Sequence, residues 1–152
     1  MGADLGLIAW HEDGRWNLSP LPVVDDLGLI MDRLKGQRTN GGALALISYD
    51  EDFFVIMRAL GSHMQMMISD VTYAQDSDLA AELLEILDLP FPEDDDEIQP
   101  GGDIGMLSDL GISAMEIEAL CHDLDLFPDE QLDAIASRLG FGEEFREIFE
   151  ID

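Results

Sequence analysis

The feature that most constrains the fold is an acidic, proline-rich stretch that divides the chain at residues 90–103. Three prolines and two glycines flank an unbroken acidic run: Pro90, Pro92, Glu93, Asp94, Asp95, Asp96, Glu97, Pro100, Gly101 and Gly102. Adjacent carboxylates repel one another and proline has no backbone N–H, so this composition favours an extended, solvated linker. The sequence therefore predicts an α+β sheet domain over residues 1–89 and a helical module over residues 104–152.

Residues 1–89 alternate between strand-like and helix-like patterns. Apolar runs bounded by turn residues predict strands, and apolar residues three or four apart predict helices. The predicted strands are Leu5–Trp10, Trp16–Leu21, Ala43–Tyr49, Phe53–Leu60 and Met64–Ser69, and the predicted helices are Asp25–Lys35 and Asp78–Leu87. The order ββαβββα indicates an α+β fold, with a five-stranded, mostly antiparallel sheet and helices on one face. This order resembles that of longin and profilin-like folds, which does not determine a function.

Residues 104–152 carry the start and stop signals of helices. Ser113 and Glu116 form a capping-box pattern, while Pro128 and Gly140 stand where a helix would begin and end. A last amphipathic segment contains Phe141, Phe145, Ile148 and Phe149. A segment of about 50 residues seldom buries a sufficient core alone. We therefore expect this module to dock on the sheet domain, on a second copy of the chain, or on a partner.

The charge of the chain limits the classes of partner. It has 34 acidic and seven basic residues, and residues 90–152 contain 19 of the acids but only two of the bases. Such a surface repels nucleic acid and anionic lipid and attracts basic proteins. No apolar run approaches the roughly 18 residues of a membrane span, and the single cysteine, Cys121, fits a reducing compartment. We expect a cytoplasmic protein without direct nucleic-acid or membrane binding.

Three short segments raise the question of metal binding. Cys121, His122 and Asp123 are adjacent, but neighbouring helical positions point about 100° apart and do not converge on one ion. The methionines near His63–Met67 suggest cuprous copper, yet strand alternation sends them to opposite faces, where core packing explains them. The acidic run lacks the ligand spacing and the glycine of a calcium loop. Because no nucleophile or phosphate-loop motif is present either, we expect no cofactor, no metal and no catalytic residue.

Three motifs resemble those of a known family. They are D-V-T-Y-A at residues 70–74, L-S-D-L-G-I-S at residues 107–113 and L-G-F-G at residues 139–142, with the acidic stretch between the first two. In this layout the chain resembles the actinobacterial tRNA adenosine deaminase-associated protein family over nearly its whole length. The resemblance implies linkage to a tRNA adenosine deaminase through neighbouring genes, and it implies no established activity.

The chain lacks the signature of the deaminase itself. A zinc deaminase needs an H-x-E…P-C-x-x-C pattern, which supplies the metal ligands and the glutamate acid/base. This sequence has one cysteine and no H-x-E. It is therefore expected to be a companion of such an enzyme.

The sequence favours a non-catalytic, acidic accessory protein that docks on a basic protein, such as a tRNA adenosine deaminase. Its predicted contact residues are the acidic run and four apolar anchors: Glu93, Asp94, Asp95, Asp96, Glu97, Leu110, Ile112, Phe141 and Phe145. Two alternatives stay open. One is a homo-oligomeric scaffold, for example a homodimer, that is unrelated to tRNA editing. The other is an enzyme or small-molecule binder with its site between sheet and module.

Overall fold

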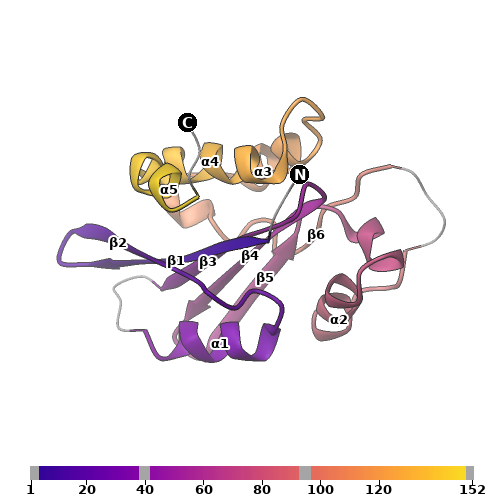
Figure 1. The fold of residues 1–152 in the computed structure, drawn as a ribbon, viewed down its shortest axis with the longest axis horizontal. Helices are drawn as coiled ribbons and strands as arrows, with labels where there is room; N and C mark the ends of the chain where they lie inside the picture. The colour runs from indigo at the N-terminus through magenta and orange to yellow at the C-terminus, as the bar shows by residue number, and fades with distance from the viewer. Residues whose placement is uncertain (1–3, 38–41, 93–96, 150–152) are drawn as a thin grey trace.

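The computed structural model describes residues 4–37, 42–92 and 97–149, which form a six-stranded antiparallel sheet with helices on both faces (Figure 1). The spatial order is β2-β1-β3-β4-β5-β6. The strands are β1 (Leu5–Glu12), β2 (Arg15–Pro20), β3 (Ala43–Tyr49), β4 (Phe53–Leu60), β5 (His63–Ile68) and β6 (Gly101–Gly102). The α+β class and the antiparallel sheet are as predicted.

The prediction of five strands was wrong, because residues assigned to the linker add β6 to the sheet. Gly101 pairs with Ile68 and Gly102 with Met67. Gly102 has a φ of 91°, and a Cβ there would collide with the carbonyl oxygen of Met66. Only glycine fits this close approach of two backbones. A two-residue glycine strand has no side chains that could alternate, so no sequence pattern indicates it.

Two helices cover one face of the sheet. They are α1 (Leu27–Lys35) and α2 (Asp78–Ile86), with a 3₁₀ turn, η1 (Val71–Gln75), before α2. Asp26 caps α1 by accepting a hydrogen bond from the backbone N–H of Leu29 at 3.1 Å, and Ser77 caps α2 through Ala80 at 3.2 Å. The apolar stripes of both helices pack on the sheet residues of this face, including Ala45, Ile47, Val55, Met57 and Ile68. Both helices therefore cover the one face, as the sequence predicted.

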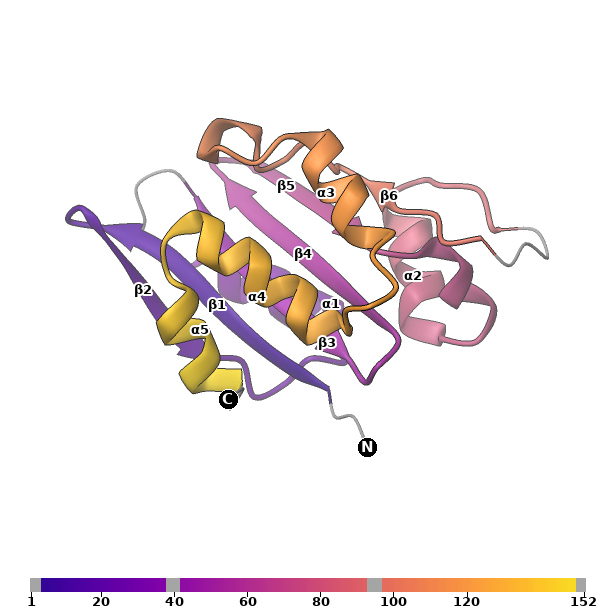
Figure 2. The ribbon, with the colours of Figure 1, turned by 90° about the horizontal axis from the view of Figure 1, so that it is seen from above.

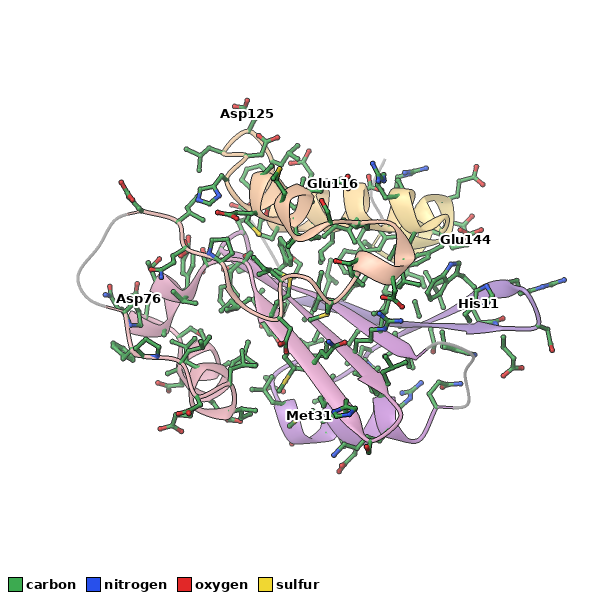
Figure 3. All side chains as sticks on the ribbon, turned by 180° about the vertical axis from the view of Figure 1, so that it is seen from behind. His11, Met31, Asp76, Glu116, Asp125 and Glu144 are labelled. Carbon is green, nitrogen blue, oxygen red and sulfur yellow. The ribbon has the colours of Figure 1, made fainter. Side chains whose placement is uncertain are left out.

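The opposite face carries the C-terminal helices, which we call the helical layer. It consists of the 3₁₀ turn η2 (Ser108–Leu110) and the helices α3 (Ala114–Cys121), α4 (Pro128–Leu139) and α5 (Gly142–Phe149). Figure 2 shows α4 and α5 lying over the sheet, and Figure 3 places Met31 of α1 and Asp125, in the loop before α4, on opposite sides of the sheet. Of the three docking modes left open by the sequence, the structure shows the module on its own sheet.

A second core joins the helical layer to the sheet. Alternate residues of the strands point into it, and its described members include Leu44, Leu46, Phe54, Ile56, Ile117, Leu132, Ile135, Phe141, Phe145 and Phe149. Strand β3 is buried along its whole length because both of its faces are covered. The two faces explain why the methionines of β5 diverge: Met66 packs in the first core and Met67 in the second.

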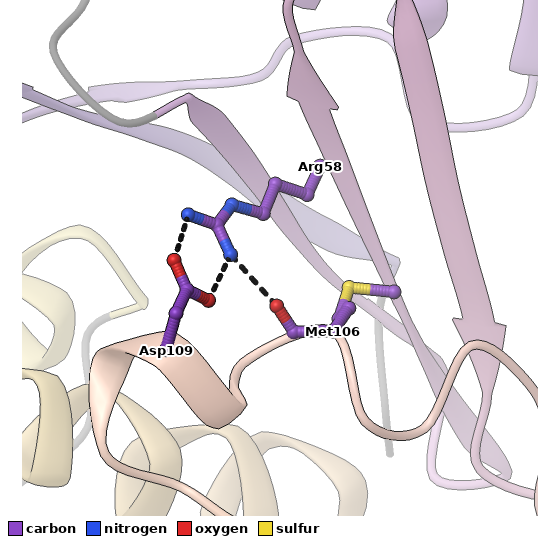
Figure 4. A network of polar contacts seen from close by, with 3 residues as sticks. All are labelled: Arg58, Met106 and Asp109. Carbon is purple, nitrogen blue, oxygen red and sulfur yellow. Dashed lines mark hydrogen bonds and ion pairs between the residues drawn. The ribbon is translucent and has the colours of Figure 1, made fainter.

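A buried arginine fixes the start of the helical layer to the sheet (Figure 4). Arg58 of β4 is 1 % exposed. Its Nη1 donates to the carbonyl oxygen of Met106 and to Oδ1 of Asp109, both at 2.7 Å, and its Nη2 donates to Oδ2 of Asp109 at 3.0 Å. The hydrogen bond from Arg58 lowers the pKa of the Asp109 carboxyl below its usual value. Asp109 therefore stays ionised and supplies the counter-charge that a buried guanidinium requires.

Candidate partner-binding surface

The acidic contact residues predicted from the sequence lie at the edge of what the structure describes. Glu93, Asp94, Asp95 and Asp96 fall outside the described residues, while Glu97 is described and exposed. The backbone on either side is held near η1. Gln75 Nε2 donates to the carbonyl oxygen of Pro92 at 3.4 Å, and the Val71 N–H donates to that of Gln99 at 2.8 Å. The described residues on either side of the run, Pro92 and Gln99, thus lie beside one turn of the sheet domain, and the role of the run in binding stays a prediction.

Three of the four predicted apolar anchors lie in the second core. Ile112, Phe141 and Phe145 are each at most 3 % exposed, and Leu110 is half-buried beside them. Their amphipathic stripe faces the sheet of the same chain. A partner could reach the three buried side chains only if the helical layer lifted from the sheet. Partner contact by these three residues stays a prediction, and it requires that the helical layer leave the sheet.

The helical layer leaves a groove of about 460 Å³ between α3 and α4. Its floor consists of the buried Ile112, Ile117 and Ile135. Its walls and rim are formed by Glu116, Ala119, Leu120, Asp123, Ala134 and Arg138. The chain reverses at residues 122–127, so the beginning of α3 lies opposite the end of α4. The result is an apolar channel with small side chains along its sides and charged groups only at its rim.

Polar bonds between α3 and α4 hold the groove open at both ends. At one end, Arg138 Nη2 lies 3.1 Å from Oε2 of Glu116 and donates to the carbonyl oxygen of Gly111 at 2.9 Å. At the other end, Nε2 of the buried Gln131 donates to the carbonyl oxygen of Leu120 at 2.7 Å. Because each helix is tied to its neighbour and packed on the sheet, the groove exists without a ligand.

Both bases of the helical layer are paired within the chain, which leaves its unpaired charged groups acidic. Arg138 and Arg146 are the only two bases of residues 90–152. Arg138 pairs with Glu116, and Nη1 of Arg146 pairs with Oδ1 of Asp133 at 3.0 Å. Both bases are therefore engaged by carboxylates of the same chain. Asp109 is paired with Arg58, whereas other acids of the layer are exposed, among them Glu118, Asp125, Glu143 and Glu144.

A second hollow of about 220 Å³ lies between the layer and the sheet, next to the groove. Its lining includes Asp52, Asp70, Tyr73 and Cys121. Burial raises the pKa of the Cys121 thiol to about 12, and burial and then nearby carboxylates raise the pKa values of Asp52 and Tyr73. A thiol held protonated is a poor nucleophile. The electrostatics of this hollow therefore do not suit cysteine catalysis.

The adjacent Cys121, His122 and Asp123 point to different places. Cys121 is buried in the second core, whereas the exposed His122 places Nδ1 2.8 Å from the carbonyl oxygen of Glu118 and Nε2 3.1 Å from that of Ile98. Across residues 4–37, 42–92 and 97–149, no group of three His, Cys, Asp or Glu side chains is arranged to hold a metal ion. In the same ranges, no helix combines the length and the apolar composition that crossing a membrane needs.

Sequence reasoning missed the groove because, in this segment, it followed only the helix-start signals of Ser113 and Glu116. Ile117 and Cys121 are the buried residues of α3, but Met115, Ala119 and Leu120 make other sides of the helix apolar too. Met115, Leu124 and Phe127 are more than half exposed on α3 and the loop that follows it. A helix that is apolar on more than one side signals a second contact surface. That signal was available in the sequence.

Comparison with known proteins identifies the family. Residues 4–142 match the model of the Rv3753c-like tRNA adenosine deaminase-associated protein family. The chain is 35 % identical over 150 residues to Protein Rv3753c of Mycobacterium tuberculosis (strain ATCC 25618 / H37Rv), covering 95 % of this chain and 87 % of that protein. No solved structure gives a significant match, so the likeness in strand order to longin and profilin-like folds stays an expectation. On the family match and the relative, the chain belongs to the Rv3753c-like tRNA adenosine deaminase-associated protein family.

Proposed function

We propose that the protein is a non-catalytic, cytoplasmic accessory protein that binds a basic surface of a tRNA adenosine deaminase through its helical layer. The family name supplies the association with the enzyme. The observation that carries the mode of binding is the engagement of Arg138 and Arg146 by acids of the same chain. The layer consequently offers a partner carboxylates without competing cations.

The chemistry of the enzyme's substrate makes such a surface useful. A protein that acts on tRNA must present a basic face to the phosphate backbone. An acidic protein that docks on that face competes with the RNA, or keeps unoccupied enzyme from associating nonspecifically. The accessory protein would then regulate access of tRNA to the enzyme without taking part in deamination.

The residues of the chain support a non-catalytic role. Catalysis by a zinc deaminase requires the H-x-E and C-x-x-C elements, and the single cysteine of this chain cannot supply them. That cysteine, Cys121, is buried with its thiol pKa raised to about 12. The chemistry of the complex is therefore assigned to the enzyme.

Binding to purified tRNA adenosine deaminase from the same organism tests the proposal. Titration calorimetry at about 50 mM and about 500 mM salt should show binding that weakens as salt rises. The variant Glu118→Gln/Asp125→Asn/Glu144→Gln removes three exposed carboxylates from the helical layer, and Asp32→Asn/Glu82→Gln/Glu85→Gln removes three from α1 and α2. We expect the first to weaken binding about tenfold more than the second.

The matched variants separate local contact from net charge. Both lower the negative charge by the same amount, so equal effects would show that the layer is not the contact surface. Absence of binding at the lower salt concentration would overturn the proposed function. Tight, saturable capture of tRNA by the isolated accessory protein would contradict it as well, because a surface of this charge should repel polyanions.

One observation favours the alternative of a homo-oligomeric scaffold. A hollow of about 320 Å³ on the α1 side is lined by Leu21, Pro22, Val23, Leu29 and Arg33 among others. Val23 and Leu29 are exposed there, and the bases Arg33 and Lys35 lie at the end of α1. The two bases at the end of α1, next to Asp32, could associate head to tail with the acidic helical layer of a second copy. Light scattering across a concentration series tests this, and a monomer at high micromolar concentration would rule it out.

A further inference from the structure

We propose that the groove between α3 and α4 binds the apolar face of a short, basic amphipathic helix of the partner protein. This inference rests on the proposed function and names the segment that the helical layer recognises. Recognition of this kind inserts side chains at i, i+3, i+4 and i+7 of one helix into an apolar channel of another protein. The channel must be apolar at its floor, open along its length, and complementary in charge at its rim.

The floor and walls meet the first two requirements. Ile112, Ile117 and Ile135 close the bottom of the groove and are at most 3 % exposed. The apolar surface open to a ligand therefore comes from Ala119, Leu120 and Ala134, and the small side chains of the two alanines leave room between the helices. The eight residues of α3 span about 12 Å at about 1.5 Å per residue. That length accommodates about two turns of a partner helix, and the volume of about 460 Å³ suits a few apolar side chains.

The ties at the ends of the groove make it a preformed site. The buried Gln131 holds Leu120 through its hydrogen bond, and the exposed Arg138–Glu116 pair bridges the helices at the other end. The floor residues are held by the second core beneath them. A partner helix therefore need not pay for opening the channel, and most of the ordering cost of binding falls on the partner.

The rim determines the charge of the occupant. Glu116 and Asp123 line the groove, and Arg138, the base among the lining residues, is already paired with Glu116. Further acids lie outside the lining on the loop and the start of α4, and add negative charge near the groove: Asp125, Asp129 and Glu130. Lysines and arginines that flank an apolar stripe would be attracted to this rim, whereas acidic segments and nucleic acid would be repelled.

A synthetic helix provides a defined probe. It is a Leu/Lys peptide of about 14 residues, two heptads, with leucine at the a, d and e positions and lysine elsewhere. A scrambled peptide of identical composition has the same charge but no apolar stripe, and a Leu/Glu peptide reverses the charge. We expect the amphipathic Leu/Lys peptide to bind at least about tenfold more tightly than either control in fluorescence anisotropy.

A filled groove tests the location of binding. Ala119→Trp places a bulky side chain in the channel from an exposed position of α3, and Met115→Trp places the same side chain on α3 outside the lining. We expect Ala119→Trp to weaken peptide binding about tenfold or more and Met115→Trp to leave it unchanged. Circular dichroism melts show whether both variants are folded. Should Ala119→Trp not fold, two charge variants locate the binding site instead: Asp123→Asn, in the lining, should weaken peptide binding more than Glu143→Gln, outside it.

The outcomes distinguish this inference from the proposed function. Equal binding of the amphipathic and scrambled peptides, or undiminished binding to Ala119→Trp, overturns the groove. If the full-length deaminase binds wild type and Ala119→Trp equally, the enzyme docks elsewhere: the groove inference fails while the accessory function stands. If the peptide binds in the groove but the deaminase does not bind at all, the accessory function fails while the groove stands.

Discussion

The two residues of the Arg58–Asp109 pair should contribute unequally to the free energy of unfolding. Removing Asp109 should destabilise the protein more than removing Arg58. Arg58 is 1 % exposed, whereas the side chain of Asp109 is 62 % exposed. Removing one partner of a buried ion pair costs about 3–5 kcal/mol, because it leaves a charge buried without compensation. Water can reach the guanidinium through the exposed side of the pair, so we expect about 2 kcal/mol for Asp109→Asn.

The opposite substitution should cost less. Arg58→Met removes the buried charge together with its desolvation penalty, and methionine fills a similar volume. It also deprives the carbonyl oxygen of Met106 of its donor, which costs about 1–3 kcal/mol if no water replaces it. Because the gain and the loss largely offset each other, we expect Arg58→Met to change the free energy of unfolding by about 1 kcal/mol or less.

A double-mutant cycle measured by urea unfolding tests this reasoning. In the Arg58→Met background, Asp109 is an ordinary surface carboxylate, and Asp109→Asn should change stability by no more than about 0.5 kcal/mol. Glu116→Gln, which breaks the exposed pair with Arg138, is the matched control and should cost no more than about 1 kcal/mol. An equal cost of Asp109→Asn in both backgrounds would refute the account.

The same pair sets a pH dependence. The pKa of the Asp109 carboxyl is lowered in the folded protein. Its contribution to stability is therefore fully present above the pKa of about 3.9 that it has in the unfolded chain. That contribution is lost as the pH falls through the lower, folded-state pKa. The stability difference between wild type and Asp109→Asn should therefore shrink as urea unfolding is repeated at pH values below about 4. A difference that stayed constant down to about pH 2 would exclude Asp109 ionisation as its source.

Three further expectations concern the second core. Phe145→Ala should cost about 3–5 kcal/mol in urea unfolding, because the side chain is fully buried; a cost near zero would contradict the packing. Cys121 should resist alkylation at pH 8 in the folded protein and react once urea unfolds it; rapid modification without unfolding would contradict its burial. The isolated residues 1–89 would expose Leu44, Leu46, Phe54 and Ile56, and should bind the dye ANS or aggregate; a monodisperse, two-state fragment would instead support residues 1–89 as an independent domain.

Much of the sheet could be predicted because its strands carry their own signals. Ala43–Tyr49 and Phe53–Leu60 are apolar runs separated by an acidic turn, and the structure gives both strands the predicted bounds. Asp26, Ser77 and Ser113 cap the starts of three helices for the same local reason. Capping and periodicity act within a few residues, so they can be recognised without tertiary contacts.

The features that escaped prediction depend on distant contacts. Strand β6 forms because the glycine backbone pairs with the edge of β5, and the residues Gly101–Gly102 themselves carry no sequence signal of that pairing. The sequence placed Phe141 and Phe145 on the apolar face of an amphipathic segment, but periodicity cannot tell which surface covers that face. The structure supplies that surface, the sheet of the same chain. It also reveals the α3–α4 groove: the sequence shows that α3 is apolar on more than one side, but not the spacing of the two helices that forms the groove.

Because β6 anchors the chain directly after the acidic segment, the length of that segment does not affect how the helical layer packs on the sheet. Gly101 and Gly102 pair with β5, and Asp103 holds Met66 through two bonds, one from its own N–H to the Met66 carbonyl at 2.8 Å and one from the Met66 N–H to its carboxylate at 3.1 Å. The path into the helical layer is thus fixed at that point, whatever precedes it. Loop closure costs grow only slowly with length. Relatives could gain or lose carboxylates before Glu97 and so tune their electrostatic reach, while the layer kept its seat on the sheet.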